Sequence, residues 1–291
     1  MKYLLFLLSL TLLSAGLLAQ PSAKHDLQFS ALAKSWDEGI PLGNGMVGAI
    51  IWQKEGRLRF ALDRSDLWDE RPMKGLHRSE FNYQWVQEQV KKKDYAIVQK
   101  YFDAPYDREA APSKISGGAL EFETNGLGES QSVHLSLQTA ISEVKWKNGV
   151  VMKTFVHATE PVGWFRFENV PDSFKPQIKP PNYKNLKNLP LDSLKSNDPA
   201  KLGYEEGKMI VGNNSIIYNQ PGWNGFNYQL AVTWKRLNAT TIEGLWTVTS
   251  NYYKTNESAE TILKKAEKRG YKKDLQSHLK WWRNFGVSHL Y

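Results

Sequence analysis

Apolar and polar residues alternate over many short stretches of the chain, and this period of two residues predicts β-strands. Residues 47–53 (VGAIIWQ) are rich in β-branched side chains, and residues 57–62 alternate polar and apolar side chains. The sequence Lys54-Glu55-Gly56 between them is typical of a tight turn. We therefore expect an antiparallel hairpin over these two stretches.

The same alternation recurs through the middle of the chain and predicts a β-meander. Two of its strands meet at Asn148-Gly149, a pair that favours the tight turn of a hairpin. Because consecutive strands joined by short turns usually pair with one another, we expect antiparallel sheets. The further strands that we expect are residues 120–123, 133–138, 141–146, 150–157, 163–168, 209–211, 216–219, 228–235 and 242–252.

Helical spacing appears in two parts of the chain. Residues 79–102 repeat apolar side chains every three or four positions, which is enough for two short helices. Residues 258–268 predict a helix that stops at Gly270, and residues 271–285 predict a second one. The predicted fold class is mainly β: a large antiparallel β-sandwich (supersandwich) with a small helical insertion and C-terminal linker helices.

The first 19 residues have the pattern of a secretory signal peptide. Met1-Lys2 is positively charged, residues 3–18 are almost wholly apolar, and Ala19-Gln20 is a plausible cleavage point. A single membrane anchor is the alternative, and the polar stretch that follows disfavours it. We expect an exported protein, periplasmic or secreted, with no membrane contact after signal cleavage.

The remaining chain divides into two predicted parts. Residues 25–253 form the β-sandwich, and residues 256–291 form a helical linker. Within the sandwich, residues 171–203 are rich in Pro, Lys, Asn and Asp, which predicts a surface insertion that is partly disordered. We find no internal repeat.

Cysteine usage and charge narrow the possible chemistry. The chain has no cysteine, which excludes disulfides, lipidation after the signal peptide and zinc–thiolate sites. Its net charge is +8, but the basic residues are spread out, so we expect solvated helix faces and no nucleic-acid partner. The 11 Trp, 13 Tyr and 12 Phe suit a protein that handles sugars, although a large β core alone would also need many of them.

Several motifs resemble one family. Trp36, the segment PLGNGMVGA (residues 41–49) and the segment LDRSDLWDERP (residues 62–72) are similar to the N-terminal domain of glycoside hydrolase family 95, the inverting α-L-fucosidases and their relatives. The pattern Leu135-x-Leu137-x-Thr139-Ala140 follows that domain's meander in order. The segment HLKWWRNF (residues 278–285) resembles its linker helix.

The resemblance implies a sandwich followed by a catalytic (α/α)6 barrel that would carry the general acid and activate water. The chain ends six residues after Phe285, so we expect that barrel to be missing and carry over no catalytic residue. The loop Asp66–Pro72 also departs from the small, Gly-rich sequence of better-known members, which leaves the sugar specificity open.

Acidic residues cluster in this loop: Asp63, Asp66, Asp69 and Glu70. They could include an acid with a raised pKa or, less readily, bind calcium. We favour a solvated loop in which Arg57, Arg59, Arg64 and Arg71 are the charge partners. His77 and His157 have no paired metal-ligand spacing, so we expect no metal and no cofactor. Gly43-Asn44-Gly45 lacks a phosphate-binding Lys and predicts a turn with positive φ.

Four residues are candidates for contact with a sugar: Trp68, Asp69, Arg71 and Trp223. An aromatic face beside planar hydrogen-bonding groups is what recognition of a pyranose ring requires. Trp68 could equally plug the end of the sandwich as a core residue. For Trp223, the neighbouring Gly and Asn indicate an exposed loop or a bulge. Of Trp281 and Trp282, one is expected to pack inward on its helix.

The residues therefore predict the N-terminal β-sandwich domain of an exported family-95-like glycoside hydrolase, with carbohydrate as ligand and the catalytic barrel as partner. A stand-alone, non-catalytic carbohydrate-binding domain is the first alternative, and a structural β domain without a ligand is the second. One fold can serve all three roles.

Overall fold

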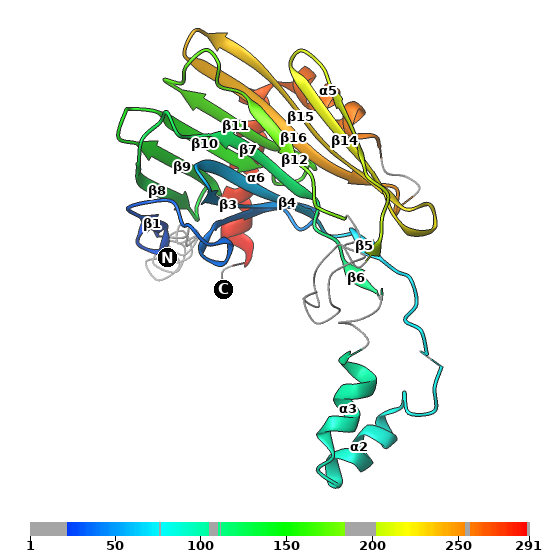
Figure 1. The fold of residues 1–291 in the computed structure, drawn as a ribbon. Helices are drawn as coiled ribbons and strands as arrows, with labels where there is room; N and C mark the ends of the chain where they lie inside the picture. The colour runs from blue at the N-terminus through cyan, green and yellow to red at the C-terminus, as the bar shows by residue number, and fades with distance from the viewer. Residues whose placement is uncertain are drawn as a thin grey trace, which may run out of the picture.

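The computed structural model describes residues 22–75, 77–104, 110, 112–183, 202–253 and 257–289, with side chains to residue 285. The protein is mainly β, with antiparallel sheets of nine and five strands (Figure 1). Phe122 on the smaller sheet lies with its ring 5.0 Å from Phe165 and 4.7 Å from Phe167 on the larger sheet. The inner faces of the two sheets therefore share one core, and the expected antiparallel sandwich is confirmed.

The larger sheet is antiparallel throughout, with its strands named below from one edge to the other. It consists of β1 (Leu27–Phe29), β8 (Ser130–Ser136), β9 (Ile141–Trp146), β10 (Val151–Val156), β11 (Gly163–Glu168), β16 (Thr241–Ser250), β15 (Asn227–Asn238), β14 (Ser215–Pro221) and β13 (Lys208–Val211).

The smaller sheet faces it and is flanked by a two-stranded ribbon. Its order is β12 (Pro176–Lys179), β7 (Gly118–Glu123), β4 (Arg57–Arg64), β3 (Val47–Lys54) and β2 (Ile40–Gly43). The ribbon pairs β5 (Trp68–Asp69) with β6 (Ser113–Lys114).

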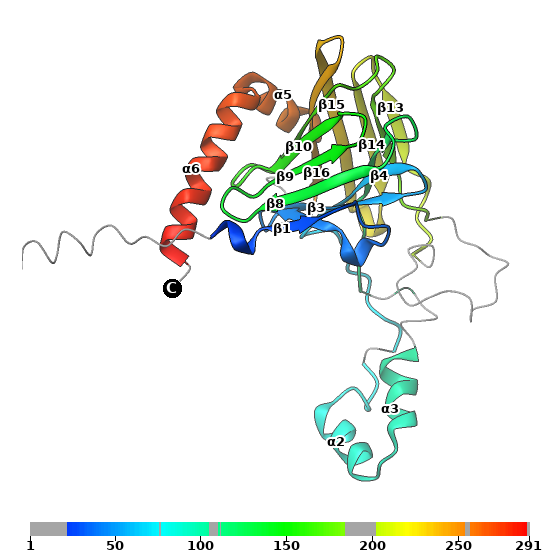
Figure 2. The ribbon, with the colours of Figure 1, turned by 90° about the vertical axis from the view of Figure 1, so that its left-hand side faces the viewer.

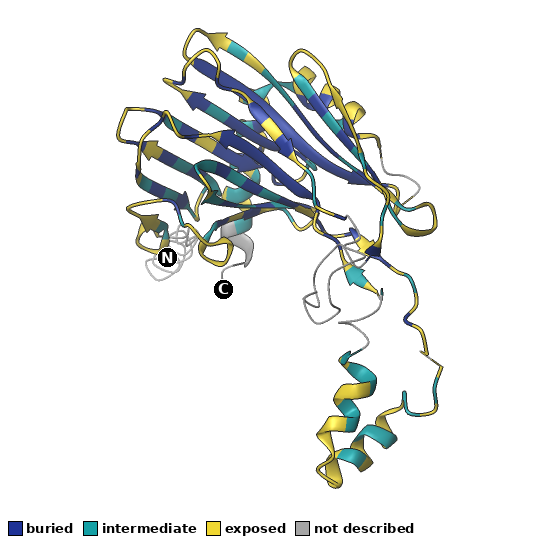
Figure 3. Ribbon diagram, viewed as in Figure 1, coloured by how far each residue is buried: buried dark blue, intermediate teal, exposed yellow. Residues whose placement is uncertain are grey.

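Burial follows the alternation read from the sequence, except where both faces of the larger sheet are covered. On β4, Leu58, Phe60 and Leu62 point inward and are buried. All ten residues of β16 are buried, which Figure 3 shows as a continuous dark strand. One face of β16 meets the smaller sheet, and the other is covered by a helix whose Leu263 is 5% exposed. Burying such a leucine contributes about 1.5–3 kcal/mol.

The helices lie in two separate places. Helices α2 (Tyr83–Lys91) and α3 (Tyr95–Phe102) form a hairpin that extends away from the sandwich (Figure 1). Helices α5 (Ala259–Arg269) and α6 (Tyr271–His289) follow the last strand and run along the outer face of the larger sheet (Figure 2). Gly270, at φ +81°, separates them where the expected helix break lies.

The expected long strands and all four expected helices are confirmed. Most of their ends lie within one to three residues of the expected positions. The turn at Asn148-Gly149 joins β9 to β10, with Gly149 at φ +87°. Short 3-10 helices complete the described elements: η1 (Ala23–His25), η2 (Trp36–Glu38) and η5 (Trp223–Gly225).

The sequence predicted the edge strand β13 but missed the edge strands β1, β2 and β12, and it misplaced the Pro-rich segment in part. Pro176–Lys179 form β12, which pairs with β7, while Phe174 and Tyr183 are buried in the core. A proline is tolerated there because it begins an edge strand, where its missing N–H is not needed. The surface-insertion prediction is therefore wrong for residues 174–183, and residues 184–201 lie outside the described residues.

The expected signal peptide, residues 1–19, also lies outside the described residues. Among the helices that the structure describes, none has the length and apolar content that a membrane span requires.

Candidate functional site

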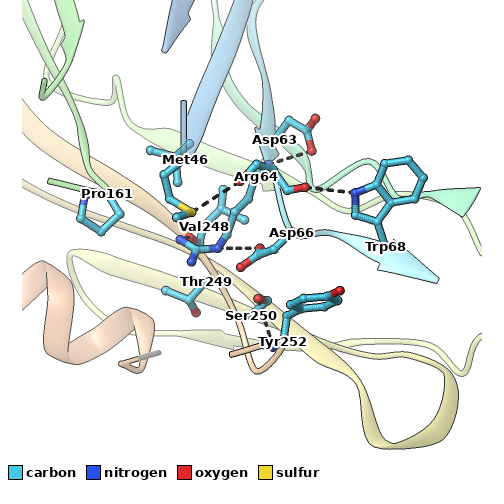
Figure 4. Close-up of polar contacts among 12 residues, drawn as sticks. Met46, Asp63, Arg64, Asp66, Trp68, Pro161, Val248, Thr249, Ser250 and Tyr252 are labelled. Atoms are coloured by element: carbon cyan, nitrogen blue, oxygen red, sulfur yellow. Dashed lines mark hydrogen bonds and ion pairs between the residues drawn. The ribbon is translucent and has the colours of Figure 1, made fainter. Parts of the chain in front are cut away.

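A pocket of about 380 Å³ opens at one end of the sandwich. Its walls come from the turn between β2 and β3, the end of β4, the loop after β10, the end of β16 and helix α5. Lining residues include Asn44, Met46, Arg64, Pro161, Thr249 and Lys265. Figure 4 shows the side chains of Met46, Pro161 and Thr249 around the guanidinium of Arg64. The pocket thus collects residues that are more than 200 positions apart in the sequence.

Asn44 fixes the shape of the first wall. Its Oδ1 accepts hydrogen bonds from the backbone N–H groups of Met46 (3.0 Å) and Val47 (2.9 Å). Its Nδ2 donates to the carbonyl oxygens of His157 and Glu160, both at 2.9 Å. Gly45 has φ +85°, which a residue with a side chain adopts only with strain. The expected positive-φ turn is confirmed, and Asn44 also ties it to the loop after β10.

Arg64 and Asp66 form a buried ion pair beside the pocket. The side chains are 5% and 4% exposed, and Nε of Arg64 donates to Oδ1 of Asp66 at 2.8 Å. Nη1 of Arg64 also donates to the carbonyl oxygen of Val248 on β16, at 3.3 Å. The guanidinium therefore bridges the two sheets in a fixed orientation, as its planar set of donors allows.

Trp68 lies at the surface next to this pair. It is 43% exposed, and its indole N–H donates to the carbonyl oxygen of Ser65 at 3.1 Å. The neighbouring Leu67 is fully buried and fills the end of the sandwich instead. The alternative that Trp68 is a core plug is therefore wrong. Its ring is held in place with a large part of its surface open to solvent.

Trp223 lies at the same end of the molecule. It is 38% exposed in η5, whose Gly225 carbonyl accepts a hydrogen bond from Nδ2 of Asn251 at 2.8 Å. That contact places η5 beside Tyr252 and Tyr253, which are 40% and 53% exposed. The tyrosines join the Trp68 loop because the hydroxyl of Tyr252 donates to Oε1 of Glu70 at 2.6 Å.

We call the four residues Trp68, Trp223, Tyr252 and Tyr253 the aromatic end. Together they supply half of the exposed aromatic side chains among the described residues. The others are Phe29, Trp36, Tyr83 and Tyr95. Exposed aromatic residues scattered singly need no explanation, but a group beside a pocket indicates a binding surface.

Asp69 and Arg71 have a structural role. Asp69 is 1% exposed, and its carboxylate accepts bonds from Nε (3.1 Å) and Nη2 (2.8 Å) of Arg71 and from the hydroxyl of Tyr204 (2.7 Å). Nη2 of Arg71 also donates to the carbonyl of Leu202 at 3.0 Å. Burial, with the bond to Asp69, raises the pKa of Tyr204 well above its usual range. A sugar contact by Asp69 does not fit this burial, because its carboxylate is enclosed by partners.

The other carboxylates around the pocket are engaged as well. Asp63 accepts from Lys114 at 2.6 Å, Glu160 pairs with Arg269 at 3.2 Å, and Glu257 pairs with Lys265 at 2.7 Å. The expected partnership of arginines with the loop acids is confirmed for Arg64 and Arg71. The expected solvated loop is wrong for Asp66 and Asp69, since both are buried.

His157 shapes the loop behind the pocket. Its Nδ1 accepts from the backbone N–H groups of Thr159 (3.2 Å) and Glu160 (3.0 Å), so the proton of the neutral ring is on Nε2, which faces Ser277 at 2.8 Å. Its ring lies 6.2 Å from that of His278, a neighbour that the sequence did not suggest. Among the described residues, no group of three or more His, Cys, Asp or Glu side chains could hold a metal ion.

The chain matches no family model and no curated protein. The likeness to glycoside hydrolase family 95 rests on the motif residues alone, and one of them, Asn44, is the residue that ties the wall of the pocket together.

Proposed function

We propose that this chain is a carbohydrate-binding β-sandwich domain of an exported, family-95-like glycoside hydrolase, and that it holds a sugar without cleaving it. The observation that carries the proposal is the aromatic end, which lies beside a pocket with polar walls. Aromatic faces stack on the C–H faces of pyranose rings, and fixed polar groups then select the hydroxyl pattern.

The pocket has the size and polarity that a short saccharide requires. Its volume of about 380 Å³ lies within the range of about 300–1,000 Å³ that is usual for small-molecule sites. Arg64 and Thr249 provide a guanidinium and a hydroxyl in its wall, and the fully bonded amide of Asn44 fixes the shape of that wall. All charged groups in that wall have partners of opposite charge within the chain, so the pocket favours a neutral ligand that hydrogen-bonds through hydroxyl groups.

Binding without hydrolysis follows from the state of the carboxyl groups. An inverting glycosidase needs one acid to protonate the leaving oxygen and one base to activate water. At this end, Asp66, Asp69 and Glu160 are in ion pairs with arginines. A carboxylate whose oxygens are bonded to a guanidinium is not free to contact a glycosidic oxygen. We therefore assign cleavage of the glycoside, as the family resemblance implies, to a catalytic barrel that acts with this domain.

Glycan binding by the purified chain tests the first half of the proposal. We expect neutral oligosaccharides from plant or host glycans to bind, and Trp68→Ala to weaken binding by about tenfold or more. Trp68→Phe keeps an aromatic face and should retain part of the affinity. Trp36→Ala is the matched control, because Trp36 is 63% exposed but lies in η2, outside the aromatic end. Equal losses in both alanine variants would contradict a specific sugar site.

Hydrolysis of aryl α- and β-glycosides, fucosides and galactosides included, tests the second half. We expect no turnover above that in buffer for the purified chain, with sugar binding retained. Turnover that disappears in Asp66→Asn or Asp69→Asn would instead place the active site in the sandwich. Absence of both binding and turnover would favour a structural β domain.

A further inference from the structure

A second, smaller cavity lies beside the strand pair β13–β14 and the segment before residue 184. Its volume is about 90 Å³, too small for a sugar ring but enough for one compact polar group. Three tyrosines line it, Tyr183, Tyr204 and Tyr218, together with Glu205 and Glu206. None of these residues lines the pocket at the aromatic end.

The tyrosine hydroxyls are engaged within the protein. Tyr183 lies with its hydroxyl 3.0 Å from that of Tyr228, Tyr204 donates to Asp69 at 2.7 Å, and Tyr218 donates to Oε1 of Gln220. The rings of Tyr183 and Tyr204 lie 4.9 Å apart at 47°, so they form two angled walls. What these side chains can offer to a guest is therefore mainly their aromatic rings.

The tyrosines stay neutral over the whole physiological pH range. Burial and the nearby carboxylate of Glu206 together raise the pKa of Tyr218 to about 12. Burial also raises the pKa of Tyr183 well above its usual range. A neutral phenol ring has a negative face that attracts a cation. Within this cluster, the guanidinium of Arg71 already lies 5.8 Å from the centre of the Tyr204 ring.

Glu205 and Glu206 add negative charge at the same place. Both are exposed, and neither forms an ion pair with another described residue, in contrast to the paired acids at the aromatic end. Two carboxylates with no cationic partner in the described part of the chain are notable in a protein of net charge +8. Aromatic rings with acidic groups at the rim are the arrangement by which proteins recognise ammonium groups.

We propose that this cavity binds an organic ammonium group, with Tyr183, Tyr204 and Tyr218 as its walls and Glu205 and Glu206 at its rim. The group is the cationic end of a small molecule, since the volume leaves no room for more. The site is separate from the proposed sugar site and does not depend on it.

Calorimetric titration with choline tests this site, with 3,3-dimethyl-1-butanol as the neutral isostere. We expect choline to bind about tenfold more tightly than the isostere, and its affinity to fall as salt is raised. The double variant Glu205→Gln/Glu206→Gln should lose most of this preference, because both residues are exposed and the change leaves the fold intact. Glu88→Gln on helix α2 removes one exposed carboxylate elsewhere and should change nothing.

Tyr204→Phe keeps the ring and removes only the hydroxyl that bonds to Asp69, so choline should still bind if the ring is what matters. Tyr204→Leu should abolish binding, with unfolding curves to confirm that the variant is folded. Equal binding of choline and its isostere, or no binding of choline to the folded protein, would overturn the proposal and leave a cavity that holds only water.

Discussion

Arg64 lies on β4 of the smaller sheet, yet its guanidinium donates to a carbonyl of β16 on the larger one. Its charge is balanced by Asp66 within the same buried region. A buried ion pair of this kind adds little net stability, but removal of one partner leaves a desolvated charge behind. The pair therefore orients the two sheets and the wall of the pocket. Its effect on the free energy of unfolding is seen only when one partner is removed.

Asp66→Leu should destabilise the protein by about 3–5 kcal/mol, because the guanidinium of Arg64 would remain buried without its carboxylate. The double variant Arg64→Met/Asp66→Leu should recover most of this loss, since both charges are then gone. Urea unfolding measured by tryptophan fluorescence gives both values. A double variant no more stable than the single one would show that the pair stabilises the fold directly.

As a control at the same scale, Lys147→Ala breaks an exposed ion pair with Glu129 and should leave the unfolding midpoint unchanged.

The candidate residues show what a sequence can and cannot predict about a site. The loop around Trp68 was identifiable from its aromatic and charged residues. The burial of Asp69 was not, because it depends on Tyr204, which is 135 positions away. The role of Asn44 was visible only in part: two flanking glycines indicated a turn, but its bonds to residues 157 and 160 arise from the packing of one sheet against the other.

At the scale of elements, long strands with regular alternation were predictable, whereas the short edge strands β1, β2 and β12 were not. The strand β1 has only three residues, and β12 alternates but begins with Pro176 inside a Pro-rich segment that is typical of a loop. Their place is decided by pairing with β8 and β7, which the local sequence does not encode. Helix starts do carry a local signal, because Asn82, Asp94 and Ser258 accept the capping bonds at α2, α3 and α5.

The α2–α3 hairpin should be dispensable for folding of the sandwich. Neither helix has a buried residue, and the ring contacts are local, as in the stacked pair Phe81 and Phe102 at 4.5 Å. We expect that replacing residues 79–103 with a short Gly-Ser linker shifts the melting temperature by only a few degrees. Circular dichroism during heating measures this shift.

Removal of helix α5 is the contrasting deletion. Leu263, Ala259 and Ala266 pack on Phe155, Trp164 and Leu245, so its loss would expose an apolar face of the larger sheet. This variant should lose cooperative unfolding. If the α2–α3 deletion did the same, the hairpin would be part of the core structure.

At the scale of the whole molecule, two histidines join helix α6 to the sandwich. His278 is fully buried, and its Nε2 donates to the carbonyl of Thr139 at 2.7 Å. Its Nδ1 is buried with no hydrogen-bond partner among the described residues. His157, on the sandwich, contacts Ser277 of α6 at 2.8 Å. Both rings are therefore built into the interface in their neutral form.

The charged groups around His157 and His278 do not reverse the preference of these rings for the neutral form. Burial lowers the pKa of His278 from 6.5 to about 4; the bond to Thr139 opposes the shift, and His157 adds to it. Burial also lowers the pKa of His157, although Asp274 and Glu160 oppose the shift and Arg269 adds to it. Protons thus bind the unfolded chain more readily than the folded one. Stability from the neutral rings is complete above pH 6.5 and is lost as the pH falls toward 4.

The free energy of unfolding should therefore fall by up to about 1.4 kcal/mol for each pH unit below 6.5 on account of His278 alone. Carboxylates with lowered pKa values, such as Glu143, titrate below their usual 4.5, so the interval from pH 5 to 6.5 reports the histidines. Urea unfolding at several pH values measures the slope. His278→Gln removes one titrating group and should flatten it, whereas His77→Gln, at an exposed position, should not. A slope that His278→Gln leaves unchanged would show that helix α6 does not couple the fold to pH through this residue.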